Sequence, residues 1–140
     1  MKTSARNHFT GRIVRLDSAP VGDNVTLRTA DGMDVHALLT SGTAVSLGLS
    51  LNSEAFALVR ATSVILLVGF DNSKVSARNC FTGRIGFIEK GLVNAEVAVA
   101  AHGGRVVAFV TNDSVGRLGL TVGRMATAIF KATSVIIGVD

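Results

Sequence analysis

The chain has 140 residues, a formal net charge of +4 and a single cysteine, Cys80. One cysteine excludes an internal disulfide framework. The longest apolar run, 64–70, is far shorter than the roughly 20 residues that span a bilayer. Positive charge is compatible with nucleic acid, an anionic surface or a small anion, but no run of Lys or Arg marks a stripe that could track a nucleic-acid backbone. No basic-then-apolar leader is visible, so we expect a cytoplasmic protein without a membrane partner.

Short runs rich in β-branched and apolar residues, separated by turn residues, predict five strands in each half. These runs are 12–16, 25–29, 35–39, 54–59 and 64–68, then 84–88, 97–99, 106–110, 126–130 and 135–139. A short helix is expected between the third and fourth strands of each half. Ser41 is predicted to cap the first and Gly48 to end it, while Asn112 or Asp113 caps the second and Gly119 ends it. The predicted fold class is mainly β, with two OB-like five-stranded Greek-key barrels in tandem.

Two polar motifs occur once in each half. Ser4-Ala5-Arg6-Asn7 returns as Ser76-Ala77-Arg78-Asn79, a spacing of 72 residues, and Ala61-Thr62-Ser63 returns as Ala132-Thr133-Ser134 at a spacing of 71. A period of this length exceeds that of solenoid repeats and matches the length of one small domain, so it indicates a domain duplication. We therefore predict domains at 1–70 and 74–140, joined by a short linker at 69–74.

The repeated polar residues are hydrogen-bond donors and positive charges. Arg60 and Lys131 precede the late motif in the two halves. Guanidinium, ammonium, hydroxyl and backbone N–H groups together suit an oxyanion. One copy could be an ordinary strand entry with a solvated arginine. Two copies in register, with their polar identities kept, favour a shared ligand.

At these residues the chain resembles the molybdate-binding Mop family, the molbindins. That family's hallmark is Ser-Ala-Arg-Asn-x-[Leu/Phe]-x-Gly-x-[Ile/Val], followed by Gly-x-Val-Asn-Ala-Glu-Val, Val-Thr-Asn-x-Ser and Lys-Ala-[Ser/Thr]-x-Val. The second half matches at 76–85, 91–97, 110–114 and 131–135. The first half departs from the pattern at 19–25 and 40–43, and Arg60 replaces lysine. The resemblance covers the whole chain as a tandem protein.

The resemblance implies OB-like units arranged about a threefold axis as a homotrimer, with oxyanion sites between units. It implies molybdate as the ligand, tungstate as a second one, and storage or homeostasis as the role. By position, the implied site residues are Ser4, Arg6, Thr40, Arg60, Ala61 and Thr62 in one set, and Ser76, Arg78, Thr111, Lys131, Ala132 and Thr133 in the other. Ala61 and Ala132 would act through backbone N–H groups. Further residues beside these sets are Ala5, Asn7, Ala77 and Asn79, the two asparagines fixing their loops, and Val93 and Asn94 in a loop near the axis.

A site made only of donors suits molybdate because this tetrahedral dianion carries no proton at neutral pH. A site built for a protonated phosphate would include an acceptor such as Asp. No reaction is implied, and no metal-ligand spacing occurs among His, Cys, Asp and Glu. His8, His36 and His102 have no partners at the equivalent repeat positions, and His36 is expected to face solvent. We therefore do not expect an enzyme.

Two other functions stay open. An OB fold could bind single-stranded nucleic acid, which requires exposed aromatic platforms. Trp and Tyr are absent, however, and Phe9, Phe56, Phe81, Phe109 and Phe130 occupy positions expected in the core. The chain could also be the ligand-sensing module of a molybdate regulator or transporter ATPase, although neither a helix-turn-helix nor a P-loop motif is found in it.

Overall fold

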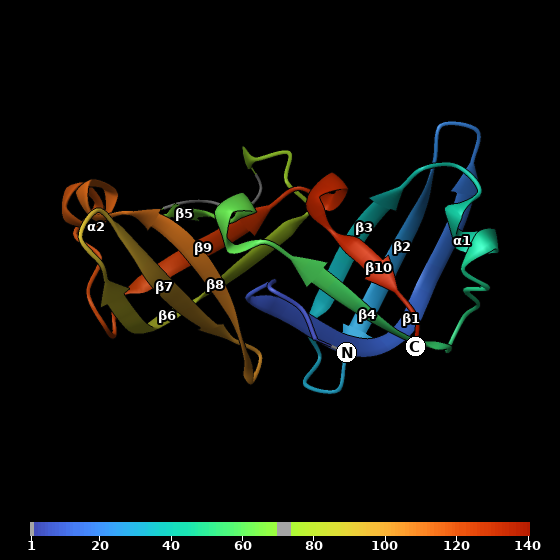
Figure 1. Ribbon diagram of the computed structural model, residues 1–140, viewed down its shortest axis with the longest axis horizontal. Coiled ribbons are helices and arrows are strands. Elements are labelled where there is room, and N and C mark those ends of the chain that lie inside the picture. Colours follow the sequence, from blue (N-terminus) through green and yellow to red (C-terminus); the bar gives the residue numbers. More distant parts are fainter. Residues whose placement is uncertain (1, 70–73) are drawn as a thin grey trace.

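Two five-stranded, curled sheets lie side by side in an elongated molecule (Figure 1). The computed structural model describes residues 2–69 and 74–140. The first lobe contains β1 (Asn7–Ala19), β2 (Gly22–Thr29), β3 (Asp34–Leu39), α1 (Thr43–Ser46) and β4 (Glu54–Val59). The second contains β6 (Asn79–Lys90), β7 (Asn94–Ala101), β8 (Gly104–Thr111), α2 (Asn112–Leu118) and β9 (Met125–Phe130). Four short elements follow β4 and β9: the 3-10 turns η1 (Ala61–Ser63) and η3 (Ala132–Ser134), and the strands β5 (Ile65–Leu67) and β10 (Ile136–Gly138).

The two lobes exchange their last strands. The sheet orders are β10-β4-β1-β2-β3 and β5-β9-β6-β7-β8. Ile136 of β10 pairs with Leu58 of β4, and Ile65 of β5 pairs with Ile129 of β9, both antiparallel. Each half of the sequence thus completes the sheet of the other half, whereas the predicted boundaries at 70 and 74 follow the sequence repeat. The part of the predicted linker at 70–73 lies outside the described residues.

The predicted fold is confirmed, and the alternation of buried and exposed residues explains it. Strand β6 begins buried, half-buried, buried, exposed, so one face of the strand packs inward while the other meets solvent. The first strand of each lobe is longer than predicted because it pairs with two neighbours, β4 or β9 along its first part and β2 or β7 along its later part. Each strand also has a bulge, where the register shifts between Ile13 and Arg15 and between Ile85 and Phe87. A bulge re-aims the strand and increases its twist, which helps a five-stranded sheet to curl on itself.

Buried apolar side chains of both lobes form one continuous core cluster. It includes Phe9 and Ile13 from the first lobe and Phe81 and Phe130 from the second. The rings of Phe81 and Phe130 stack with centroids 5.8 Å apart. Since the core is shared and the fifth strands are exchanged, the lobes support each other, which units of about 70 residues need.

The helix caps differ from the predictions. Thr111, not Asn112 or Asp113, caps α2: its backbone is extended and its side chain accepts a hydrogen bond from the Ser114 N–H. Asn112 is already the first helical residue. Gly119 ends α2 in the left-handed region, as predicted. The Ser41 prediction is wrong, because Gly42 holds the N-cap position of α1 at a φ of 87° and no side chain caps it from there.

Helix α1 is anchored from the sheet instead. The N–H of Ala44 donates a hydrogen bond of 3.0 Å to Oδ2 of Asp23, whose side chain is fully buried at the start of β2. A carboxylate near the first turn of a helix accepts from otherwise unpaired N–H groups. Asp23 therefore does in the first lobe what the threonine cap does in the second.

Two glycines permit close strand contact at equivalent places. A Cβ atom on Gly11 would overlap the carbonyl oxygen of Arg28, and one on Gly83 would overlap that of Ala100. Both positions lie where the long first strand crosses against the second strand of its lobe. Within the described ranges 2–69 and 74–140, no helix has the length and apolar character needed to cross a bilayer.

Candidate functional site

Both repeated motifs lie where the two lobes meet. The Ser-Ala-Arg segments lead into β1 and β6, and the late motifs form η1 and η3. The turn η1 packs against β8 of the second lobe, and η3 packs against β3 of the first (Figure 1). Each late motif therefore packs against the opposite half of the chain.

The motif asparagines hold this arrangement in place. The side-chain amide of Asn7 donates to the carbonyl oxygen of Val107 at 2.8 Å, and its oxygen accepts from the Val107 N–H at 2.7 Å. Asn79 makes the same pair of bonds with the backbone of His36, both at 2.8 Å. Val107 and His36 lie on β8 and β3, the edge strands of their sheets. An amide side chain thus satisfies an open strand edge.

A pocket of about 550 Å³ gathers most of the first predicted set. The predicted residues that line it are Ser4, Ala5, Arg6, Arg60, Ala61 and Thr62. Its remaining lining residues are Thr3, Leu58, Glu96, Phe109 and Ile136. Three of these, Glu96, Phe109 and Ile136, come from the second half of the chain, because β10 is exchanged, β8 packs against η1 and Glu96 of β7 pairs with Arg6. The pocket is therefore a joint product of both halves.

Thr40 does not line this pocket. It follows β3, and its Oγ1 lies 2.6 Å from Oγ1 of Thr43 at the start of α1. Thr111 holds the equivalent place in the second lobe, where its hydroxyl bonds to Ser114. Thr111 also lies two residues beyond the pocket residue Phe109 on β8. The cross-lobe arrangement therefore puts Thr111, rather than Thr40, on the strand that borders the first set.

The second set is arranged around η3 and the first lobe. Arg78 and Lys131 are exposed, as are the hydroxyl residues Ser76 and Thr133. Nη1 of Arg78 lies 3.5 Å from Oδ1 of Asn24 on β2. In the first set, by contrast, Nε of Arg6 forms an ion pair of 2.7 Å with Oε2 of Glu96 on β7. Glu96 is not among the site residues that the sequence predicted.

Val93 and Asn94, the two predicted loop residues, lie beside Thr111 and the start of α2. Asn94 pairs with Thr111 in the β7–β8 ladder, and the carbonyl oxygen of Val93 accepts from the Asn112 N–H at 2.8 Å. The Val93 side chain is 67% exposed. These contacts show how the loop is supported, and a ligand role for Val93 and Asn94 remains a prediction.

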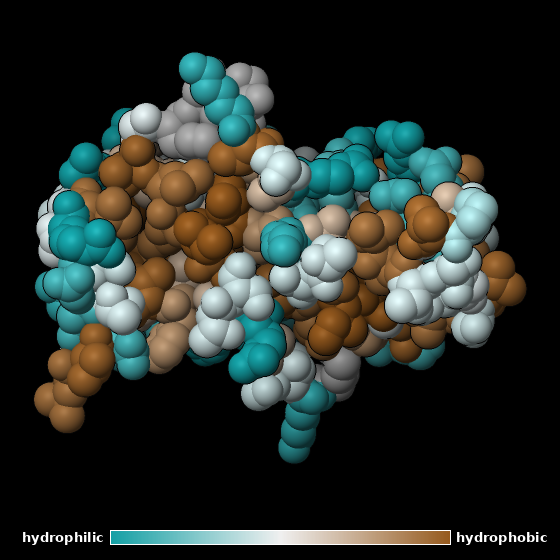
Figure 2. All heavy atoms as spheres, turned by 90° about the horizontal axis from the view of Figure 1, so that it is seen from above, coloured by the Kyte–Doolittle hydropathy of each residue, from teal (hydrophilic) through white to brown (hydrophobic). Residues whose placement is uncertain are grey.

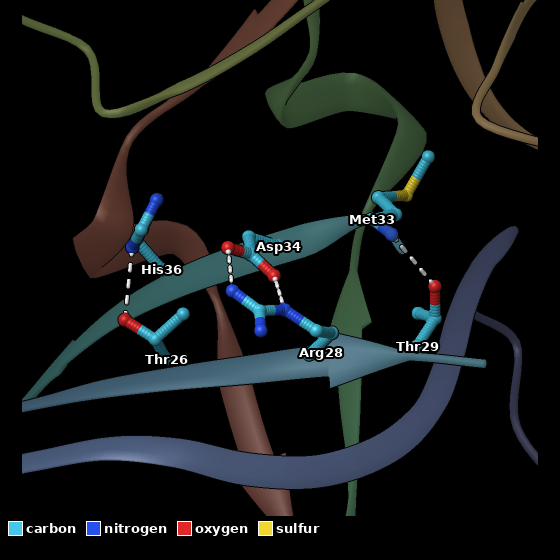
Figure 3. Close-up of polar contacts among 6 residues, drawn as sticks. All are labelled: Thr26, Arg28, Thr29, Met33, Asp34 and His36. Atoms are coloured by element: carbon cyan, nitrogen blue, oxygen red, sulfur yellow. Dashed lines mark hydrogen bonds and ion pairs between the residues drawn. The ribbon is translucent and has the colours of Figure 1, made fainter. Parts of the chain in front are cut away.

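His36 is half-buried, whereas the sequence predicted a solvent-facing residue. Its Nδ1 shares a hydrogen bond of 3.0 Å with Oγ1 of the buried Thr26, as Figure 3 shows. Burial lowers the pKa of the His36 imidazole, and the positive charge of Arg78 lowers it further. The equivalent residues of the second lobe, Ala98 and Val107, are apolar and buried. This polar pair is therefore a feature of the first lobe.

A second hollow of about 790 Å³ lies on the first lobe, away from the motifs. It contains Arg12, which pairs with Glu54 at 3.1 Å, and Arg28. The Arg28 guanidinium donates two hydrogen bonds, of 2.7 and 2.9 Å, to the Asp34 carboxylate (Figure 3). These bonds hold the pKa of the Asp34 carboxyl below its usual range. Each arginine of this hollow pairs with its own carboxylate, whereas the motif pocket has one carboxylate for two arginines, so the larger hollow is the poorer anion site.

The chemistry of the motif pocket is that of a binding site for an anion. It presents two guanidinium groups, the hydroxyls of Ser4 and Thr62, and one carboxylate. Among residues 2–69 and 74–140, no three His, Cys, Asp or Glu side chains gather as metal ligands would. Fold and site together define a protein with two small OB-like β-barrel modules in tandem and a donor-rich pocket at their junction.

The TOBE domain family matches the chain twice, over residues 3–66 and 75–137. The chain therefore belongs to the TOBE domain family and carries two of these domains, so the resemblance to the molbindins is confirmed. It is 40% identical over 141 residues to the "Molybdenum transport protein ModE" of Herbaspirillum seropedicae, covering 100% of this chain and 52% of that protein. It is 36% identical over 138 residues to the "Molybdenum-pterin-binding protein MopA" of Rhodobacter capsulatus, covering 98% of this chain and 52% of that protein. The chain thus spans about half the length of these relatives.

A solved structure matches over the full length of both chains. It is the cytoplasmic molybdate-binding protein ModG with molybdate bound, with a TM-score of 0.91 and 40% sequence identity. Such a score over the whole length means that the tandem arrangement of the two domains is shared, in addition to the fold of each domain.

Proposed function

We propose that this chain binds molybdate, and tungstate as a close analogue, without catalysing a reaction. The observation that carries this proposal is the pocket in which Ser4, Arg6, Arg60 and Thr62 converge. Charged donors form the strongest hydrogen bonds to oxyanions, and hydroxyl groups can turn their protons toward the same oxygens. The full-length similarity to a molybdate-bound protein supports the same ligand.

The proposed site residues fall into two sets at the two lobe junctions. The first consists of Ser4, Arg6, Arg60, Ala61 and Thr62, and the second of Ser76, Arg78, Lys131, Ala132 and Thr133. Within η1, the N–H groups of Ser63 and Val64 donate to the carbonyl oxygens of Arg60 and Ala61, and we assign the Ala61 N–H to the ligand. We assign Thr111 to the first set and Thr40 to the second, because the motifs cross to the opposite lobe.

We further propose a cytoplasmic homotrimer that stores or buffers molybdate. Apolar side chains remain exposed beside the motifs: Ile65 is 58% exposed, Ile136 60% and Phe109 42%. Figure 2 shows hydrophobic surface on both lobes of one face. Burying these side chains between copies of the chain would stabilise an assembly and would shield the pocket from water, which strengthens its charged contacts.

Binding of single-stranded nucleic acid has less support. Phe9, Phe81 and Phe130 are buried in the core, so they cannot stack on bases. Phe109 is exposed, contrary to the sequence prediction, and Phe56 is half-buried. Among the phenylalanines in the described ranges, Phe109 is the one that is exposed, and a single ring beside an isoleucine does not make the repeated stacking platform that such proteins use.

A role as the sensing half of a regulator has specific support from the relatives. The chain is 34% identical over 140 residues to the "Transcriptional regulator ModE" of Yersinia pestis and spans 52% of it. In that case the same sites would report molybdate to a further domain. The ligand is shared by both proposals, so the test of binding serves both.

Calorimetric titration with molybdate, with and without excess sulfate at fixed ionic strength, tests the proposal. We expect saturable binding of more than one ion per chain that survives sulfate. Arg78→Ala and Lys131→Ala should each remove part of the binding. No binding, or binding that sulfate abolishes equally, would refute a molybdate function and direct attention to nucleic acid.

A further inference from the structure

The two junctions of one chain differ in the group that faces the motif arginine. Glu96 on β7 faces Arg6, and Asn24 on β2 faces Arg78. Asn24 and Glu96 occupy equivalent positions of the repeat, because they are 72 residues apart, the same spacing that separates Arg6 from Arg78. The repeat therefore conserves the arginine and changes its partner from a charged to a neutral side chain.

The two contacts have different strengths. Nε of Arg6 and Oε2 of Glu96 are 2.7 Å apart, and the Glu96 side chain is only 28% exposed. A charge-assisted bond of this length occupies one position of the guanidinium fork that would otherwise receive an oxyanion. The contact between Arg78 Nη1 and Asn24 Oδ1 is 3.5 Å long and has a neutral acceptor, so it holds the arginine weakly.

The charge available to a ligand differs accordingly. The pocket with Arg6 contains two positive groups and one carboxylate, because Glu96 lines it together with Arg60. At the junction with Arg78, Lys131 holds the repeat position of Arg60, and the residue that faces Arg78, Asn24, is neutral. By this correspondence, a dianion would meet two positive charges at the second junction and a net single positive charge at the first.

We propose that Glu96 acts as a built-in competitor for Arg6, so that each chain holds two unequal classes of molybdate site. The inference rests on the proposed function and adds an order of filling: the Arg78 site fills first, and the Arg6 site fills only when molybdate displaces the Glu96 carboxylate. A carboxylate about 5 Å from a dianion weakens binding on the order of tenfold even at the dielectric constant of water. Two affinities in one chain extend the concentration range over which it buffers its ligand.

The test is a calorimetric molybdate titration of the parent chain and of charge-exchange variants at low and constant ionic strength. The parent should show two phases at least tenfold apart in affinity. Glu96→Gln removes the charge and keeps the shape, so the weaker phase should tighten by about tenfold. Asn24→Glu should weaken the tighter phase by a similar factor.

Matched controls assign the phases. Glu54→Gln removes a glutamate that also pairs with an arginine, Arg12, outside this pocket, and it should leave both affinities unchanged. Arg6→Ala should abolish the weaker phase and Arg78→Ala the tighter one. If Asn24→Glu does not fold, Glu96→Gln alone decides.

The outcomes separate this inference from the proposed function. Saturable binding whose weaker phase does not respond to Glu96→Gln would overturn the competitor role and leave molybdate binding intact. Equal affinities in the parent chain would do the same. A complete lack of binding in the parent chain would overturn the proposed function and this inference with it.

Discussion

The substitution Asn7→Ala should destabilise the whole protein through its effect on a strand edge. The Asn7 side chain is 2% exposed and makes two hydrogen bonds to the backbone of Val107. Alanine leaves one buried N–H and one buried C=O of β8 without partners. Each unpaired group costs about 1–3 kcal/mol, so we expect a loss of about 2–6 kcal/mol in the free energy of unfolding. Domain stabilities total about 5–15 kcal/mol, so the loss would be severe.

Urea unfolding followed by circular dichroism, at one fixed protein concentration, measures this loss. Thr10→Ala is the matched control, because Thr10 is exposed on the same strand β1, and it should cost less than about 1 kcal/mol. Asn7→Ala should also weaken molybdate binding, since Asn7 follows the pocket residue Arg6 directly. A loss below about 1 kcal/mol for Asn7→Ala would refute the argument that the asparagine completes the edge of β8.

Three further perturbations test the fold. Gly83→Ala should lower the free energy of unfolding by about 3 kcal/mol or more, because its Cβ would overlap a carbonyl oxygen of β7. Gly116→Ala on α2 has open space around it and should raise the free energy of unfolding by about 0.5–1 kcal/mol. Equal effects of the two variants in denaturant unfolding would contradict this. The lowered pKa of His36 means that the unfolded chain takes up a proton more readily, so stability should fall as the pH drops below about 6.5. The double variant Thr26→Ala/His36→Val should flatten this dependence in melts between pH 5 and 8, and an unchanged slope would show that other groups cause it. Deletion of 135–140 removes β10 from the first sheet and should abolish cooperative unfolding of that lobe. Hydrogen exchange measures this, because the backbone amides of β4 should lose their protection. Protection retained on β4 would argue against the exchanged strand.

The strands could be predicted well because burial on one face imposes a period of two. The run 54–59 was predicted at the bounds that the structure gives to β4. The helix caps were less predictable, since a cap depends on where the preceding strand ends. Thr111 closes β8 in an extended conformation, and that geometry makes it the cap in place of Asn112.

The residue types of the candidate site could be predicted from the sequence. Which of these residues meet in one pocket could be predicted only in part. Ser4, Arg6, Arg60 and Thr62 meet in one pocket, as the two polar motifs suggested. Glu96 was missed as a pocket residue, although it stands where the first half has Asn24. That charge difference between repeats was the available signal, but only the structure shows that the two positions face the motif arginines of the opposite halves.

The sequence by itself determined that the chain is a duplicated β module with a polar motif kept in both copies. Local alternation, turn residues and repeat spacing carry that information because each depends on near neighbours in the chain. Only the tertiary structure decided which half completes which sheet. The β5 and β10 segments are both short apolar strands of the same repeat, so either could pair with β4 or β9 by pattern alone. The turn η1 packs against β8 and η3 packs against β3. Because β5 and β10 each begin two residues after these turns, each fifth strand lies close to the sheet of the opposite lobe and pairs there.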